Sequence, residues 1–303
     1  MVCRAIPQHD TLMEQQTDFN KRFKEQILRV FNYTVSFLEE HGLRYIACGG
    51  TVLGAVRHQD FIPWDDDIDI YMPRQDYERL LDLKEESRRR GFDVLSLRDD
   101  GYYLPFAKVS DMHTTLWELE QFPLVMGIYV DVFALDNFSC SDAELTAIQH
   151  KALKKFYHYL PSVVQFLPRV FLKALQQGNS ELAMLHLQSL FLHPFRKLLL
   201  NKFMDYQRMY SSFDGDKSVC VTQWPGRIFK REWFEDVIDQ PFGNITVKIP
   251  RDYDGYLTCL YGDYMKLPPV EQRVSQHHHH YLNFEEGLTL DEVKQRLAHK
   301  TAK

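Results

Sequence analysis

The chain has few of the features that mark disulfide-stapled, zinc-binding or membrane-spanning proteins. Its 303 residues include only five cysteines, scattered and odd in number, and no Cys-x-x-Cys pair occurs. A disulfide framework or a zinc site is therefore not expected, and the cysteine pattern suits a reducing cytoplasm. No run of 18 apolar residues is present, and residues 1–17 lack the apolar stretch of a secretion signal. We accordingly expect a cytoplasmic protein.

An excess of positive charge is also absent. Lys and Arg number 36 against 42 Asp and Glu, so the net charge is −6. This balance argues against a nucleic-acid-binding protein. An anionic ligand would have to be held by local basic groups and a metal. With 45% hydrophobic residues, the chain can bury a large core, as one domain or as one domain with an insertion.

What the sequence does contain is a concentrated acidic segment. Residues 65–70 read Asp-Asp-Asp-Ile-Asp-Ile. Residues two apart on a strand point to the same face, about 6.5–7 Å apart, so Asp67 and Asp69 would repel each other unless a cation lay between them. Mg²⁺ takes oxygen ligands and leaves room for phosphate oxygens, so we predict an Mg²⁺ site, with Mn²⁺ as the alternative ion. A solvated acidic turn or a small calcium loop are the competing interpretations.

A third carboxylate is predicted on another strand. Residues 127–134 form a β-branched and aromatic run that contains a single charge, Asp131. A buried carboxylate is costly without a partner, and a metal shared with Asp67 and Asp69 would be one. An Arg or Lys across the sheet is the alternative partner. Asp136 is a weaker candidate because it follows the expected strand end.

The residues ahead of the acidic segment suit a phosphate group. An expected strand at 44–48 ends at Gly49-Gly50, and Thr51 can cap the helix that follows. Glycines let the backbone approach a phosphate, and the first amides of a helix favour anions; a plain strand-to-helix turn is the alternative. Arg57 can grip a phosphate with two hydrogen bonds, or it can interact with the helix dipole. The predicted substrate-binding residues here are Gly49, Gly50, Thr51, Arg57 and His58.

Together these residues resemble a known family. Residues 49–80, GGTVLGAVRHQDFIPWDDDIDIYMPRQDYERL, resemble the signature of the LicD family of phosphotransferases, which includes the fukutin-related proteins. Softer similarity lies at 103–109 and 130–136, and the specific motif YGDYMKLPP lies at 261–269. The resemblance covers roughly residues 25–140 and 223–280.

The resemblance implies an α/β (α+β) fold, with a nucleotidyltransferase-like mixed sheet core, flanking helices and a helical insertion. It also implies Mg²⁺-dependent, EC 2.7.8-like transfer of a phospho-alcohol from a CDP-activated donor to a sugar hydroxyl of a cell-surface glycan, with release of CMP. CDP-choline is the favoured donor and a teichoic acid or lipopolysaccharide glycan the favoured acceptor, as in the best-known branch of the family. CDP-ribitol is an alternative donor. Nucleotidyl transfer and a non-catalytic glycan- or nucleotide-binding scaffold remain as rival functions.

By the family pattern, Asp67 and Asp69 are metal ligands and Asp131 is the third acid, which could also accept the hydroxyl proton. Lys108 is a further candidate for binding phosphate, or else an ordinary lysine at a strand edge. Near the C-terminus, we expect three residues to contact the donor phosphate: Arg273, His277 and His278.

We expect three parts: a catalytic core at 1–140, a helical insertion at 141–215, and residues 216–303 completing the catalytic domain. The insertion is apolar-periodic and rich in Lys and His. A plain packing layer is its simplest interpretation. The alternative is an acceptor-binding or membrane-surface helix set, with peripheral contact at the inner face of a membrane and a lipid-linked glycan acceptor.

Overall fold

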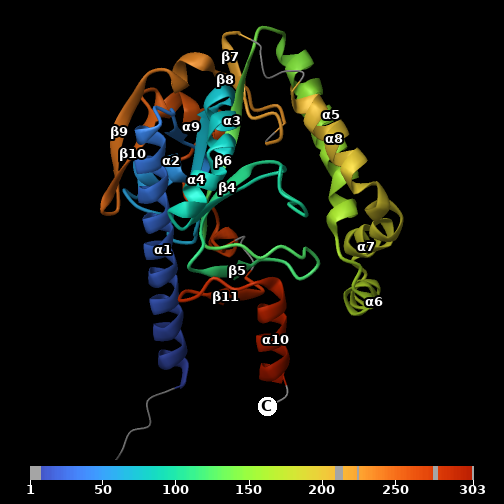
Figure 1. Cartoon of the computed structure of the whole chain (residues 1–303). Coiled ribbons are helices and arrows are strands. Elements are labelled where there is room, and N and C mark those ends of the chain that lie inside the picture. The colour runs from blue at the N-terminus through green and yellow to red at the C-terminus, as the bar shows by residue number, and fades with distance from the viewer. Residues whose placement is uncertain (1–7, 209–213, 224, 276–278, 302–303) are drawn as a thin grey trace, which may run out of the picture.

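The computed structural model describes residues 8–208, 214–223, 225–275 and 279–301 of the chain (Figure 1). Side chains are described for residues 19–207, 214–223, 225–275 and 279–299. Among the described residues, none of the helices combines the length and the apolar character that crossing a bilayer requires.

A mixed sheet lies at the centre of the fold. Its strands are ordered β1 (Ile46–Ala47), β2 (Asp69–Pro73), β6 (Tyr129–Phe138), β4 (Ala107–Asp111) and β3 (Phe92–Leu95). β2 and β6 run parallel, whereas the other neighbours in this order are antiparallel. The far end of β6 also pairs with β7 (Lys217–Val219), which pairs with β8 (Phe229–Lys230). The predicted mixed sheet is thus confirmed, although the strand bounds differ from those predicted.

The central strand β6 explains why the sheet forms around the predicted third acid. Nine of its ten residues are buried, as its β-branched and aromatic composition predicts. The parallel register sets Asp131 of β6 opposite Asp69, the first residue of β2. The sheet therefore brings together two acids that lie 62 residues apart in sequence.

Helices flank this sheet. The long helix α1 (Gln8–Glu40) runs along β6 and β4 and buries Phe23, Ile27, Val30 and Phe31 at helical spacing (Figure 1). The helices α2 (Gly49–Arg57), α3 (Arg74–Asp82) and α4 (Lys84–Arg89) follow β1 and β2 along the chain.

The C-terminal residues return to the sheet. The hairpin of β9 (Val237–Phe242) and β10 (Ile245–Pro250) contacts β1 and α2, and α9 (Tyr253–Tyr261) also packs against α2. Strand β11 (Tyr281–Asn283) pairs with β5 (Thr115–Trp117), and α10 (Leu290–Thr301) follows it. One hydrophobic core contains side chains from both ends of the chain. That residues 1–140 and 216–303 form one catalytic domain stays a prediction.

Four helices occupy the segment between these two parts: α5 (Asp142–Val163), α6 (Pro168–Gln176), α7 (Ser180–Leu192) and α8 (Arg196–Arg208). A capping box between Ser141 and Glu144 fixes the start of α5. α5 and α8 pack together, with the Phe156 and Phe203 ring centroids 5.5 Å apart, while α6 and α7 lie at the end of this pair away from the sheet (Figure 1). The helical character agrees with the sequence, but the insertion boundaries stay a prediction.

Candidate active site

Three carboxylates converge where β2 begins beside β6. One carboxylate oxygen each from Asp67, Asp69 and Asp131 lies within 4.8 Å of the other two. Ile68 and Ile70 are fully buried, so the predicted alternation of acidic and apolar residues is present. The strand begins at Asp69, so Asp67 precedes it. Even so, the structure brings together all three predicted acids.

The start of α2 holds the backbone of Asp69 in place. The Asp69 N–H donates to Oγ1 of Thr51 at 2.8 Å, and the Cys48 N–H donates to the Asp69 carbonyl oxygen at 3.0 Å. The prediction that Thr51 caps α2 is wrong, because Cys48 is the N-cap and contributes no side-chain bond. Thr51 is 3% exposed, so its hydroxyl orients Asp69 rather than facing an open surface.

The electrostatics of this cluster suit a cation. Burial, followed by the negative charges of Asp67 and Asp131, raises the pKa of Asp69 well above its ordinary value. Lys108 opposes this rise. A divalent cation among these oxygen atoms would offset both the burial and the repulsion, so the residues present fit the predicted Mg²⁺ site.

Lys108 forms an ion pair with the third acid. Its Nζ lies 2.8 Å from Oδ1 of Asp131, and the two residues face each other across β4 and β6. Lys108 is 2% exposed and lies in a strand with neighbours on both sides, so it is not a strand-edge lysine. The Lys that was the alternative partner of Asp131 is therefore present in addition to the acid cluster. Phosphate binding by Lys108 stays a prediction.

Behind this pair lies a buried network that sequence reasoning did not select. Nζ of Lys108 is 3.9 Å from Oε1 of Glu118 and 3.1 Å from the ring centroid of Tyr129. Tyr129 and Tyr103 both donate hydroxyl hydrogen bonds to Glu118. The sequence signal was weak, because Tyr103 lies in the segment 103–109, where the family resemblance is soft.

A cavity of about 620 Å³ opens beside the acid cluster, within the size range of small-molecule sites. Four predicted site residues line it: Gly50, Arg57, Asp67 and Asp69. It also has an aromatic wall that the sequence did not locate, formed by Trp64, Tyr261 and Tyr264. The predicted metal ligands Asp67 and Asp69 and the predicted phosphate-binding residues Gly50 and Arg57 therefore line the same cavity.

The backbone conformation at Gly49 and the close Asp65 side chain beside Gly50 favour glycine at both positions. Gly49 has a φ of +53°, and its N–H donates to the Tyr256 hydroxyl at 3.0 Å. A Cβ on Gly50 would lie 2.7 Å from Oδ2 of Asp65, so a side chain cannot be accommodated there without movement. These contacts agree with the strand-to-helix turn, and phosphate binding by either glycine stays a prediction.

Arg57 reaches the cavity from the last turn of α2. Its guanidinium donates to the Tyr264 carbonyl oxygen at 2.7 Å and to Nε2 of His58 at 2.9 Å. Burial lowers the pKa of Arg57 and, together with Arg57 itself, that of His58. The helix-dipole alternative agrees with this position, and Arg57 also lines the cavity.

Arg273 is connected to the cavity wall. Its guanidinium carbon lies 5.5 Å from the ring centroid of Trp64, and its Nε donates to the Pro268 carbonyl oxygen at 2.9 Å. His277 and His278, the remaining predicted phosphate contacts, lie outside the described residues.

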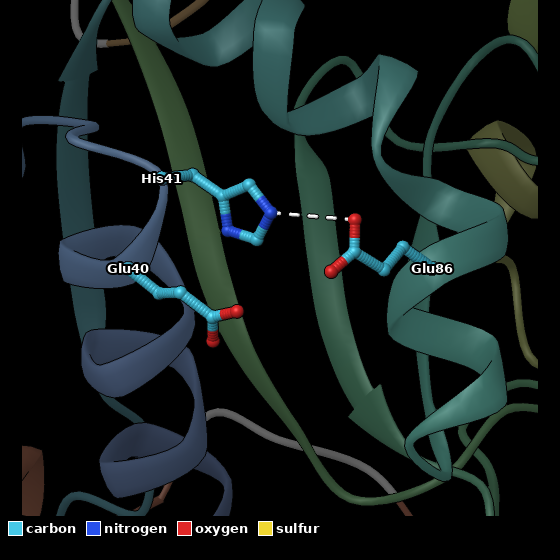
Figure 2. A group of neighbouring side chains, drawn as sticks. All are labelled: Glu40, His41 and Glu86. Atoms are coloured by element: carbon cyan, nitrogen blue, oxygen red, sulfur yellow. Dashed lines mark hydrogen bonds and ion pairs between the residues drawn. The ribbon is translucent and has the colours of Figure 1, made fainter.

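Acidic side chains at two other places form ion pairs with arginines. Arg74 binds both carboxylate oxygens of Asp136, at 2.8 and 2.7 Å, so Asp136 is not part of the acid cluster. Figure 2 shows Glu40, His41 and Glu86, whose donor atoms also lie within 4.8 Å of one another. Arg90 pairs with both of these glutamates, at 2.6 and 2.5 Å, so this group joins α1 to α4 as an ion-pair network.

Comparison with known proteins gives matches to the family that residues 49–80 resemble. A family model described as LicD/FKTN/FKRP, nucleotidyltransferase domain, matches residues 42–164. The chain is 28% identical over 258 residues to the lipopolysaccharide cholinephosphotransferase LicD of Haemophilus influenzae, covering 82% of this chain and 92% of that protein. It is 33% identical over 91 residues to the human ribitol 5-phosphate transferase FKRP, covering 28% and 18% of the two chains. An uncharacterized protein of Rickettsia prowazekii is 31% identical over 90 residues, covering 29% of this chain and 34% of that protein.

Proposed function

We propose that this chain is a phosphotransferase of the LicD/FKTN/FKRP family, because residues 42–164 match the nucleotidyltransferase-domain model of that family, in agreement with the resemblance of residues 49–80. It moves a phospho-alcohol from a CDP-activated donor to a hydroxyl of a cell-surface glycan and releases CMP. The observation that carries this proposal is the convergence of three acids, Asp67, Asp69 and Asp131, beside a cavity lined by Arg57. Asp131 is buried and the other two acids are partly buried, so their mutual repulsion destabilises the fold and a scaffold without catalytic function gains nothing from it.

The reaction proposed is a displacement at phosphorus. The acceptor hydroxyl oxygen forms a bond to the phosphorus nearest the alcohol, and the bridging P–O bond to CMP breaks. Asp67, Asp69 and Asp131 would hold Mg²⁺, which supplies charge neutralisation for the phosphate oxygens when bound. Asp131 is the proposed acceptor of the hydroxyl proton, and its ion pair with Lys108 fixes the orientation of its carboxylate.

The aromatic wall supports choline as the transferred alcohol. Trp64, Tyr261 and Tyr264 line the same cavity as Asp67 and Asp69. Aromatic faces attract a quaternary ammonium, whereas a polyol such as ribitol would need hydrogen-bond partners along that wall. The relative aligned over most of the chain is also named as a cholinephosphotransferase. We therefore propose CDP-choline as donor, with CDP-ribitol as the alternative, and a lipopolysaccharide or teichoic acid type of glycan as acceptor.

The test is mass spectrometry of the purified full chain incubated with Mg²⁺, CDP-choline or CDP-ribitol, and glycan acceptors. We expect CMP and a phosphocholine-modified glycan from CDP-choline, both lost with EDTA. Asp69→Asn should abolish the product, whereas Asp291→Asn, a change at an exposed position in the first turn of α10, should leave it unchanged. A CMP-modified acceptor with release of free phosphocholine or ribitol phosphate would indicate nucleotidyl transfer instead. No product from any donor and acceptor would overturn the proposal.

A further inference from the structure

Helix α7 exposes its large apolar side chains. Met184, Leu187 and Phe191 share one face of the helix and are 52%, 41% and 68% exposed. The positions that α7 buries are instead small or polar, namely Ala183, His186 and Ser189. An ordinary surface helix has the opposite arrangement, with the apolar face inside. The exposed face of α7 therefore has the composition of a contact surface.

The neighbouring elements expose apolar side chains as well. Leu172 and Leu175 of α6 are 56% and 55% exposed, and Phe195, in the turn before α8, is 55% exposed. We call the six residues of this group the apolar tip: Leu172, Leu175, Met184, Leu187, Phe191 and Phe195. α6 and α7 lie at the end of the α5–α8 pair, away from the sheet (Figure 1). Single exposed apolar residues are ordinary, but a group confined to consecutive short elements indicates an interaction site.

The charge around the apolar tip indicates the chemistry of its partner. Residues 145–204 contain eight Lys or Arg and a single acid, Glu181, in a chain whose net charge is −6. Lys173, Lys197 and Lys202 are exposed, and none of them forms an ion pair with another residue that the structure describes. A second copy of this chain would bring like charges together, which opposes association through this face. A surface that is apolar and negatively charged is complementary to it.

We propose that the apolar tip docks the protein on a lipid bilayer that contains anionic headgroups. Leu and Phe side chains enter the boundary between headgroups and acyl chains, and the lysines interact with the anionic headgroups. The packing-layer interpretation of this segment therefore applies to α5 and α8, which bury Phe156 and Phe203, and to Leu185 of α7, which packs against the same cluster. It does not account for the exposed apolar side chains of α6 and α7. The proposal does not depend on the reaction, because it rests on none of the cavity residues.

The test is co-sedimentation of the purified full chain with sucrose-loaded vesicles. We expect binding to phosphatidylcholine vesicles that contain phosphatidylglycerol, and much weaker binding to pure phosphatidylcholine. The double variant Leu187→Ser/Phe191→Ser should lower the partition coefficient at least about tenfold, and so should Lys173→Glu/Lys197→Glu. All of these positions are exposed, and circular dichroism checks that each variant keeps its helices.

Matched controls test whether the effect is local. Met112→Ser removes an apolar side chain that is 37% exposed elsewhere, and Lys294→Glu makes the same charge change on α10. Both should bind vesicles as the unmodified chain does, and so should the inactive Asp69→Asn variant. Equal, weak binding to both vesicle types would overturn the proposal. It would also be overturned by a dimer in solution that Leu187→Ser/Phe191→Ser converts to a monomer.

Discussion

Lys108 and Asp131 face each other on adjacent antiparallel strands, 2 and 5% exposed, with Nζ 2.8 Å from Oδ1. Asp131 also belongs to the acid cluster with Asp67 and Asp69. A single carboxylate therefore joins a buried ion pair to the proposed metal site. Changes to Lys108 should thus affect both stability and activity.

We expect Lys108→Met to lower the free energy of unfolding by about 3–5 kcal/mol, because it leaves the buried Asp131 carboxylate without its cation. Urea denaturation without divalent metal measures this loss. The double variant Lys108→Met/Asp131→Asn should lose less than the sum of the two single variants, because both single changes remove the same ion pair. Additive losses would contradict a coupled pair.

Asp69→Asn should raise the melting temperature of the metal-free protein. Burial and the charges of Asp67 and Asp131 disfavour the Asp69 carboxylate, and a neutral amide of the same shape removes that repulsion. Asp136→Asn should have the opposite effect, because Asp136 is held by two hydrogen bonds from Arg74. Mg²⁺ should raise the melting temperature of the unmodified chain and of Asp136→Asn, but not of Asp69→Asn. Scanning calorimetry with and without EDTA distinguishes these outcomes, and stabilisation of Asp69→Asn by Mg²⁺ would contradict the assigned ligand.

Thr51→Val should reduce CMP release although it keeps the side-chain volume. The Asp69 N–H would lose its hydrogen-bond acceptor, at a cost of about 1–3 kcal/mol in stability, and the carboxylate would lose its fixed position. Thr51→Ser retains the hydroxyl and should keep most of the activity. Full activity of Thr51→Val in the same CMP assay would show that this bond is not needed.

Replacement of Tyr261 by Leu tests the proposed choline contact. Loss of a cation–π interaction of about 0.5–2 kcal/mol should raise KM for CDP-choline by about 2- to 30-fold. KM for CDP-ribitol, if that donor reacts, should change less. Tyr157→Leu alters an exposed tyrosine on α5 and serves as the control. An equal rise in KM for both donors would place Tyr261 against a shared part of the donor.

The pH dependence of stability should include a contribution from His58. Burial, with a smaller effect from Arg57, lowers the pKa of His58 below its ordinary value of 6.5, so folding favours the neutral imidazole. This contribution is present above about pH 6.5 and is lost as the pH falls through the lowered pKa. The melting temperature should therefore fall more steeply between about pH 7 and pH 5 in the unmodified chain than in His58→Gln. His158→Gln, an exposed change on α5, should retain the steeper slope.

Local patterns predicted the parts of the site that depend on neighbouring residues. The alternation from Asp67 to Ile70 and the lone charge of Asp131 sufficed to select the three acids, because strand periodicity determines which side chains share a face. The partner of Asp131 could not be chosen from the sequence, because the register of β4 against β6 arises from tertiary packing. The aromatic wall was missed for the same reason, since Trp64 and Tyr261 are brought together only by the complete fold.

Helix α7, which exposes large apolar side chains, shows a different limit of prediction from the sequence. Its apolar residues recur at helical spacing, which usually indicates a face that is packed inside the protein. The pattern gives the helix but not the medium that its apolar face contacts. In this chain the buried positions of α7 are Ala183, His186 and Ser189.

The hydrogen bond from the Gly49 N–H to the Tyr256 hydroxyl joins residues 207 positions apart. During synthesis at about 5–20 residues per second, roughly 10–40 s separate the appearance of these two residues. Throughout that interval the turn beside the acid cluster lacks the partner that completes it. A growing chain that has not yet exposed Tyr256 therefore cannot assemble this turn in its final form, and the site matures only after residue 256 has been synthesised.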